Sequence, residues 1–248
     1  MSNRDDLEVV LAPTDRGRDV WEQAATNRMC PRCKRSYSAP PMPGVTHMLC
    51  DECMAADESA RRDRERDARA TRHVLVTIPP RYAWATFDAP EFAVRDPVAT
   101  DRLRAASADR GIVVLGPSGV GKTTLAVCKL RQCVAQNGSL GMFVDVRRLA
   151  RAARQHPLGS SSEVPLVAES IRADVLLLDD LGEERGADDA VLDVIRDRHA
   201  QDRPTIVTSG HALTMRSGIE VFGQRYGDGI ARRLFQGAVV IELRLPPP

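Results

Sequence analysis

The sequence predicts an α/β fold in which helices cover both faces of a parallel sheet, with a small metal-binding module ahead of it. Three observations lead to this prediction. A glycine-rich loop separates an apolar run from a helix-like stretch, further apolar runs alternate with helical stretches, and two Cys-x-x-Cys pairs precede them. With 248 residues, 43% of them hydrophobic, the chain is long enough for one ordinary domain and a small accessory one.

The glycine-rich loop reads GPSGVGKT and fits the phosphate-binding pattern G-x-x-x-x-G-K-[ST]. It follows the apolar run 112–115 and precedes a helical stretch, which is the context that the motif requires. Such a loop points its backbone N–H groups at phosphates, Lys122 adds a positive charge, and Thr123 offers a hydroxyl to Mg²⁺. The residues expected to bind ATP are Gly116, Pro117, Ser118, Gly119, Val120, Gly121, Lys122, Thr123 and Thr124.

A second nucleotide motif follows one of the later apolar runs. These runs cover 141–146, 175–178, 205–208 and 238–243, with helical stretches between them. Run 175–178 delivers Asp179 and Asp180 to the carboxyl edge of the sheet, where open α/β sheets bind their ligands. We expect Asp179 to bind ATP-associated Mg²⁺ and Asp180 to orient or deprotonate the attacking water. Adjacent acids are also common turn residues, but the phosphate loop upstream favours the catalytic interpretation.

The cysteine spacing predicts a structural zinc site. Two Cys-x-x-Cys pairs are separated by sixteen residues, and they comprise Cys30, Cys33, Cys50 and Cys53. Four thiolates close a tetrahedral shell around Zn²⁺ and leave no open position for catalysis. Disulfides are the alternative, and His47 is interpreted as a surface residue. Cys128 and Cys133 have neither metal-ligand nor redox spacing, so they are expected to be buried.

These motifs divide the chain into three parts: an N-terminal region with the zinc module at 1–53, a charged helical linker at 54–73, and a nucleotide-binding domain at 74–248. The linker interleaves six arginines with five acidic residues, so it is interpreted as a spacer, with nucleic-acid contact as the alternative. The net charge of +1 gives no global reason for nucleic-acid binding. No apolar run approaches a membrane span of roughly 18 residues, so we expect a cytoplasmic protein without membrane contact.

With these motifs the chain resembles a known family, the DnaC-like and IstB-like AAA+ ATPases. The likeness covers residues 74–245 and rests on the segments IPPRY and TFD, the loop GPSGVGKT, the strand VLLLDDLG, the strand end TSG, and GDGIARRL. It implies a P-loop NTPase of the AAA+ (ASCE) type. Because five residues follow Leu243, the helical lid after the last strand is expected to be absent.

The resemblance also implies a function and a further catalytic residue. Members of the family load replicative helicases or assist transposases. We therefore expect an ATPase that yields ADP and phosphate, self-associates through its ATP sites, and binds a hexameric helicase and single-stranded DNA during DNA replication. The segment GDGIARRL implies that Arg233 acts on the ATP of a neighbouring subunit, although Arg232 and Arg233 are alternatively a surface basic pair.

Two positions depart from the family pattern. Gly229 stands where the family pattern has its first arginine, so a second basic contact is missing or comes from Arg232. Gly210 stands where the family often has Asn, which leaves Thr208 or Ser209 to sense the γ-phosphate. Three functions compete with the loader: an IstB-like transposition helper, a P-loop small-molecule kinase, and a non-enzymatic zinc adaptor with a vestigial nucleotide site.

Overall fold

The computed structural model describes residues 26–39, 48–89, 96–107, 109–156, 164–184 and 188–244. The chain divides into two compact units, Met1–Asp63 and Arg64–Pro248, which are described separately below. His47 lies outside the described residues. No helix among the described residues is long and apolar enough to cross a membrane.

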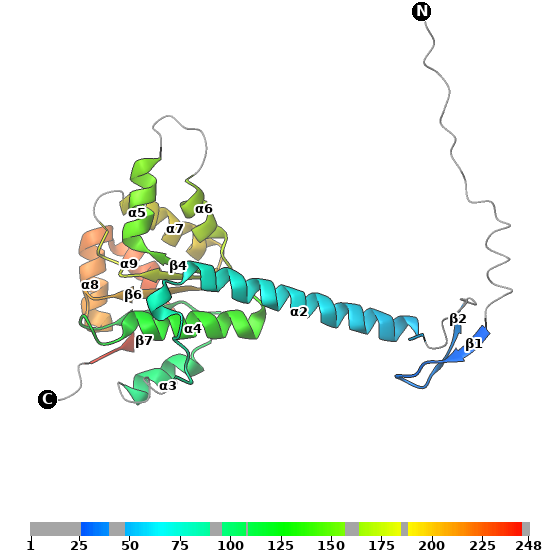
Figure 1. Ribbon diagram of the computed structural model, residues 1–248. Coiled ribbons are helices and arrows are strands. Elements are labelled where there is room, and N and C mark those ends of the chain that lie inside the picture. Colours follow the sequence, from blue (N-terminus) through cyan, green and yellow to red (C-terminus); the bar gives the residue numbers. More distant parts are fainter. Residues whose placement is uncertain are drawn as a thin grey trace, which may run out of the picture. The chain divides into compact units, whose positions relative to one another are not determined.

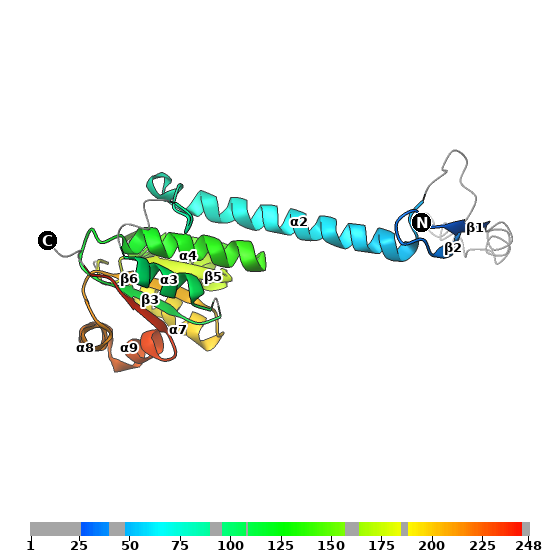
Figure 2. The same ribbon diagram turned by 90° about the horizontal axis from the view of Figure 1, so that it is seen from below.

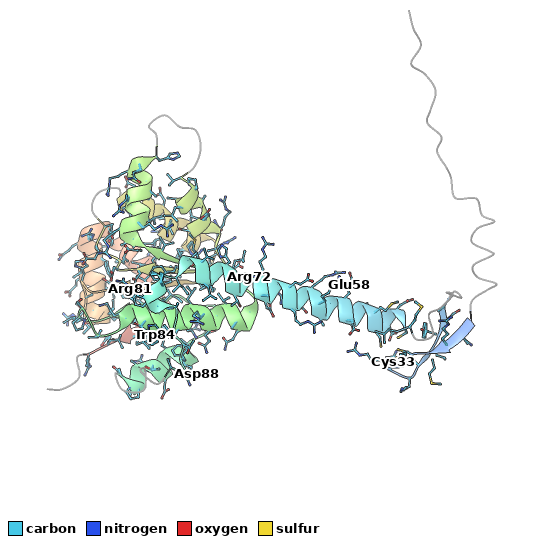
Figure 3. All side chains as sticks on the ribbon, in the orientation of Figure 1. Cys33, Glu58, Arg72, Arg81, Trp84 and Asp88 are labelled. Atoms are coloured by element: carbon cyan, nitrogen blue, oxygen red, sulfur yellow. The ribbon has the colours of Figure 1, made fainter. Side chains whose placement is uncertain are left out.

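The N-terminal unit contains a short hairpin and the start of a long helix. Strands β1 (Thr26–Met29) and β2 (Ser36–Ala39) pair antiparallel, and Cys33 lies on the turn between them (Figure 3). Helix α2 (Asp51–Thr77) begins with two acidic residues, which suit the positive end of a helix dipole. Exposed ion pairs join Arg32 to Asp57 and Arg35 to Glu52 within this unit.

Helix α2 is longer at both ends than the charged linker predicted at 54–73. Its last turns belong to the second unit, where Ala70 and Val74 are buried in the core. This packing keeps the helix intact through Thr77, and Pro79 and Pro80 then prevent it from continuing. The short helix η1 (Pro80–Tyr82) follows, and Arg131 holds this segment by donating a hydrogen bond of 2.7 Å to the Ala83 carbonyl.

The second unit is built on a parallel sheet of five strands in the order β4-β5-β6-β3-β7. Strands β4, β6 and β7 of this sheet are labelled in Figure 1. The strands are β3 (Ile112–Leu115), β4 (Gly141–Asp145), β5 (Val175–Asp179), β6 (Thr205–Ser209) and β7 (Val239–Glu242). They occupy the five apolar runs identified in the sequence, so the predicted fold class is confirmed. Strand β3 lies between β6 and β7, which places the phosphate loop beside the end of β6.

Helices cover both faces of this sheet because side chains along each strand alternate between the faces. Ile112 and Val114 belong to one hydrophobic core with α4, whereas Val113 and Leu115 belong to another with α7, α8 and α9 (Figure 2). The helices are α3 (Pro97–Ala105), α4 (Lys122–Asn137), α5 (Val146–Gln155), α6 (Pro165–Arg172), α7 (Asp188–Ala200), α8 (Met215–Tyr226) and α9 (Asp228–Phe235).

The buried Arg198 on α7 is a structural residue that the sequence does not reveal. Its guanidinium is fully buried and donates hydrogen bonds to backbone carbonyls at the end of α6 and before β5 and β6. These acceptors are the carbonyls of Ser170, Ile171, Ala173, Asp174 and Pro204. A cation at this place satisfies carbonyls that a helix C-terminus leaves without partners.

We expect Arg198→Met to lower the free energy of unfolding by about 3 to 5 kcal/mol, because it removes a buried cation that donates to several backbone carbonyls at once. Urea denaturation followed by circular dichroism measures this loss. The control is Arg196→Met on the same helix, because Arg196 is exposed and forms an exposed ion pair with Asp193. Equal losses for the two variants would contradict the structural role of Arg198.

Candidate functional site: a nucleotide-binding centre and a cysteine cluster

The phosphate loop curls between β3 and α4 in the shape that phosphate binding requires. Gly116 and Gly121 have positive φ angles of 146° and 97°, which L-residues rarely adopt. A side chain at Gly116 would also collide with the Leu243 carbonyl, since its Cβ would lie 2.5 Å from that oxygen. Gly121 caps α4, so the open N–H groups of the first turn face the loop. This backbone cradle fits the phosphates of ATP.

Lys122 lies at the start of α4 with only 7% of its surface exposed. Its ammonium group donates a hydrogen bond of 2.8 Å to the Pro117 carbonyl. Burial lowers the pKa of Lys122, while the charges of Asp180 and Asp179 partly oppose that shift. A buried cation with one carbonyl partner is suited to an anionic ligand, so the position of Lys122 fits a phosphate group.

Asp179 ends β5 and is 2% exposed. Burial raises its pKa from 3.8 to about 6, and the nearby Asp180 charge adds to this, whereas hydrogen bonds from Thr208 and Thr123 oppose it. The Thr208 hydroxyl donates to Asp179 Oδ1 over 2.7 Å. The sheet and the loop thus bring Asp179 and Thr123 together. The Thr123 hydroxyl and the Asp179 carboxylate fit Mg²⁺, which prefers oxygen ligands.

Asp180 has a strained backbone, with φ of 60°, which is uncommon outside glycine. Its N–H donates a hydrogen bond of 2.9 Å to the Thr208 hydroxyl, which holds the strained position. Such strain persists only where surrounding structure enforces it, and it is concentrated at functional sites. The side chain is partly exposed, so water can reach its carboxylate.

The raised pKa of Asp179 leads to a stability prediction for the nucleotide-free protein. Above pH 6 this aspartate is charged in both the folded and unfolded states, and its burial then costs about 3 kcal/mol, at about 1.4 kcal/mol per pKa unit. The cost falls as the pH drops through 6 and vanishes below 3.8. Asp179→Asn is therefore expected to raise the free energy of unfolding by about 3 kcal/mol at pH 8. At pH 5 the increase should be about half as large.

Urea denaturation of the two proteins at both pH values measures this difference. Asp180→Asn is the control, because its carboxylate is partly exposed and its replacement should change stability by less than about 1 kcal/mol. If the Asp179→Asn protein were less stable than the unaltered protein at pH 8, burial of the Asp179 charge would not be the main contribution of this residue to the free energy of unfolding.

Sequence reasoning missed Asp145 and Arg147, which also reach this site. Asp145 ends β4 and is the register partner of Asp179 on the neighbouring strand. Arg147, in the first turn of α5, donates to Asp145 over 2.9 Å and lies 3.3 Å from Asp180 Oδ2. The signal was available, since Asp145 is the acidic residue within the apolar run 141–146. The contact with Asp180 required the tertiary structure.

The two residues considered as sensors are engaged within the site. Thr208 binds Asp179, and the Ser209 hydroxyl donates to the Leu181 carbonyl over 2.7 Å. Gly210 lies beside Lys122, because a Cβ at this position would be 3.7 Å from the ammonium nitrogen. The next residue, His211, has its Nε2 3.2 Å from Glu183 Oε1. The assignment of a sensor residue therefore stays a prediction.

Glu184 was also missed, and it connects the loop after β5 to α8. Its carboxylate is buried, accepts a hydrogen bond from the Gly182 N–H over 3.0 Å, and pairs with Arg225. The Tyr226 hydroxyl donates to the same carboxylate. The loop that carries Asp180 is thereby tied to the end of α8, directly before α9.

Arg233 lies far from the phosphate loop of its own chain. It is in the last turn of α9 and lines a cavity of about 440 Å³ together with Gly111, Thr205 and Ala238. These three residues stand at the amino edge of the parallel sheet, whereas the phosphate loop follows the carboxyl edge. Strand β3 separates the edges by about 13 Å, at about 3.3 Å per residue. The structure therefore does not bring Arg233 together with Lys122, Asp179 and Asp180.

The four predicted zinc ligands do come together in the N-terminal unit. The sulfur atoms of Cys30, Cys33, Cys50 and Cys53 all lie within 4.8 Å of one another. None of them forms a disulfide. Cys128 and Cys133 are buried in α4, as expected. Four thiols converging on one point are the donor set that suits tetrahedral Zn²⁺.

The environment of the cluster favours a cation among the sulfurs. Burial opposes ionisation of Cys30, but N–H groups of Cys33, Cys50 and Arg32 outweigh it and lower its pKa to about 6. Burial and the neighbouring thiols raise the pKa of Cys53 to about 12. Four thiolates cannot be charged together without a metal ion to neutralise them. The cysteine cluster is thus consistent with a zinc module.

Comparisons with known proteins agree with this geometry. The family model described as IstB-like ATP binding protein matches residues 45–243. The crystal structure of the DnaC helicase loader is 23% identical, with a TM-score of 0.55, and the match covers 68% of this chain and 100% of that one. The structure of DnaI is 21% identical, with a TM-score of 0.51, covering 68% and 95%.

A search of curated protein sequences gave no match. The two structural likenesses fall below 25% identity, so they show the fold, whereas the family model spans most of the chain and includes both nucleotide motifs. On this evidence the chain belongs to the family of IstB-like ATP-binding proteins.

Proposed function

We propose that the protein is an ATP-hydrolysing loader of a replicative DNA helicase, and that it works as an assembly of several copies. The observation that carries the proposal is the separation of Arg233 from the phosphate loop by the length of β3. An arginine at that edge is too far away to serve its own site, and in an assembly it would serve the ATP site of a neighbouring copy. Self-association would therefore complete each ATP site.

Within one copy, different residues bind the phosphates, bind Mg²⁺ and activate water. The loop N–H groups and Lys122 hold the phosphates, while Thr123 and Asp179 hold Mg²⁺, which supplies charge neutralisation when it is bound. Asp180 orients a water molecule and accepts its proton, so that the products are ADP and phosphate. Arg233 of a neighbouring copy stabilises the charge that develops on the phosphate oxygens.

Hydrolysis by an isolated copy should then be slow, because the site lacks the partner arginine. ATP would act as a switch: copies close on one another when it is bound, and a helicase or single-stranded DNA changes that geometry. This is a coupling between two binding sites. The N-terminal unit with its cysteine cluster would dock on the partner, since it is separate from the ATP site in sequence and fold.

The likeness to the DnaC helicase loader, which extends over all of that chain, supports the loader proposal. The match to the IstB-like family model equally supports a second candidate, a helper ATPase for a transposase. The nucleotide chemistry is the same in both, so only the partner separates them. A small-molecule kinase would transfer phosphate to an acceptor other than water, and a zinc adaptor would give no turnover with any partner.

Affinity capture of the tagged protein from its native host, with ATP present, tests the proposal. Mass spectrometry identifies the captured proteins, and we expect a hexameric replicative helicase. The matched control is Lys122→Ala, which removes the positive charge of the phosphate loop and should lose the ATP-dependent partner. Capture of a transposase in place of a helicase would move the function to transposition.

A further inference from the structure

A buried carboxylate connects the loop after β5 to the corner between α8 and α9. The Glu184 side chain has no exposed surface, which is costly for a charged group unless donors surround it. It accepts hydrogen bonds from the Gly182 N–H over 3.0 Å, from Arg225 Nε over 3.3 Å, and from the Tyr226 hydroxyl. Arg225 also donates to the Glu184 carbonyl over 2.8 Å. We name Glu184, Arg225 and Tyr226 the Glu184 network.

The Tyr226 hydroxyl is a donor in the Glu184 network. Burial and the nearby Glu184 carboxylate raise the pKa of Tyr226, so the hydroxyl keeps its proton. The Tyr226 ring stacks on Phe222, with 5.9 Å between the ring centroids. The place of the ring in the core is therefore set by packing, and removal of the hydroxyl alone separates the hydrogen bond from that packing.

The catalytic end of the loop is held by contacts outside the Glu184 network. Asp180 and Leu181 donate their N–H groups to the hydroxyl and the carbonyl of Thr208, over 2.9 and 2.8 Å. The Ser209 hydroxyl donates to the Leu181 carbonyl over 2.7 Å. Because these contacts fix Asp180 to β6, the element that depends on Glu184 is the one at the other end of the network, α8.

The other end of the Glu184 network lies at the corner where α8 meets α9. Tyr226 is the last residue of α8, and Gly227 alone separates it from α9. Among the described residues, none supplies a side-chain cap for the first turn of α9. The buried Ile230 and Leu234 fix which side of α9 faces the core, whereas the corner fixes where the helix starts. The position of Arg233, in the last turn of this short helix, follows from both.

We propose that the Glu184 network positions Arg233, by holding α9 so that its arginine meets the ATP of a neighbouring copy in a reactive geometry. A cation stabilises developing charge only where it is correctly placed, so the contacts that fix α9 affect the rate. Glu184 and Tyr226 are positioning residues, since they act through α9. The inference rests on the proposed role of Arg233 between copies, and it adds the residues of the donating copy on which that role depends.

Mixtures of two full-length variants test the Glu184 network. Asp180→Asn copies lack the residue expected to activate water but still carry Arg233, so they serve as arginine donors. Arg233→Ala copies retain Asp180 and serve as acceptors. The donor is titrated to saturation against a fixed amount of acceptor, and phosphate release gives the plateau rate. The comparison is between the Asp180→Asn donor and the Asp180→Asn/Tyr226→Phe donor.

We expect the plateau rate to fall about tenfold when the donor carries Tyr226→Phe, because a misplacement of about 1 Å can cost up to about a hundredfold. The KM for ATP should stay unchanged, since the acceptor copy binds the ATP and its own network is intact. A donor that only associates more weakly would need a higher concentration and would reach the same plateau. That outcome would overturn the positioning role.

Two controls separate positioning from folding. The Arg233→Ala/Tyr226→Phe acceptor, mixed with the Asp180→Asn donor, should reach the same plateau as the Arg233→Ala acceptor. An equal fall in this arrangement would mean that the hydroxyl supports the whole unit, which contradicts the proposal. The matched control is Tyr37→Phe in the donor, which removes a hydroxyl that donates to the Met48 carbonyl in the N-terminal unit and should leave the plateau unchanged.

Glu184 variants of the donor give a second measurement. Glu184→Ala removes the acceptor of the network and should lower the plateau at least as much as Tyr226→Phe. Glu184→Gln keeps an oxygen that accepts from the Tyr226 hydroxyl and should restore part of the rate. Equal plateaus for Glu184→Ala and the donor with an intact network would refute the proposal.

The mixture of Arg233→Ala with Asp180→Asn also tests the proposed function by itself. If this mixture recovers no activity, the role of Arg233 between copies fails, and this inference fails with it. If it recovers activity and the Tyr226→Phe donor performs equally well, only this inference is overturned. Capture of a helicase uses none of these mixtures and tests the loader assignment separately.

Discussion

Arg233→Ala is expected to abolish the stimulation of ATP hydrolysis by self-association or a partner while ATP affinity stays near normal. The arginine lies at the amino edge of the sheet, away from its own phosphate loop, so its loss should leave nucleotide binding in the same copy intact. An arginine supplied by a partner raises hydrolysis by about 10³ to 10⁵ in GTPases, which is an upper guide here. Phosphate release and nucleotide binding by fluorescence measure the two properties separately.

Two controls make this result specific. Arg232→Ala removes the neighbouring, more exposed arginine of the same helix turn and should have the smaller effect. Mixing the Arg233→Ala protein with Asp180→Asn copies should recover part of the activity, because each protein supplies what the other lacks. Unchanged stimulated hydrolysis in Arg233→Ala would refute the assignment and leave Arg233 as a surface residue.

Replacement of one clustered cysteine is expected to release zinc and unfold the N-terminal unit. Metal analysis of the unaltered protein should give close to one Zn²⁺ per chain, and Cys30→Ser or Cys53→Ser should give close to none. Metal binding of this kind supplies about 10 to 16 kcal/mol of apparent stabilisation. The hairpin of β1 and β2 is too small to remain folded without it.

Cys133→Ser is the matched control, since it replaces a cysteine buried in α4 outside the cluster. It should retain zinc even if it destabilises the second unit. Limited proteolysis then locates the unfolding: cleavage before Asp63 is expected to increase in the clustered-cysteine variants only. Full zinc content in both Cys30→Ser and Cys53→Ser would rule out a four-cysteine shell.

The parts of the site that the sequence predicts are those whose residues are adjacent in the chain. The loop that carries Lys122 and Thr123 recurs with fixed spacing because phosphate binding needs a turn, several N–H groups and a helix start in succession. Asp179 and Asp180 are found in the same way, at the end of an apolar strand. The strand runs themselves are recognisable because a parallel sheet covered on both faces demands continuous apolar residues.

Other parts of the site join residues that are distant in the chain. The contact between Arg147 and Asp180 requires β4 and β5 to be neighbours in register. The pairing of Glu184 with Tyr226 and Arg225 requires α8 to return to the loop after β5. No local sequence pattern predicts either of these two contacts, since an arginine in a polar stretch is usually solvated.

By itself the sequence determined the nucleotide motifs, the cysteine pattern and the order of strands and helices, because short-range spacing encodes each of them. Only the tertiary structure decided that Arg233 and Lys122 lie at opposite edges of the sheet, and that Glu184 joins the loop after β5 to the end of α8. The physical reason is that strand order and helix packing set these distances. They follow from burial of apolar surface across the whole unit, which no single segment of the sequence specifies.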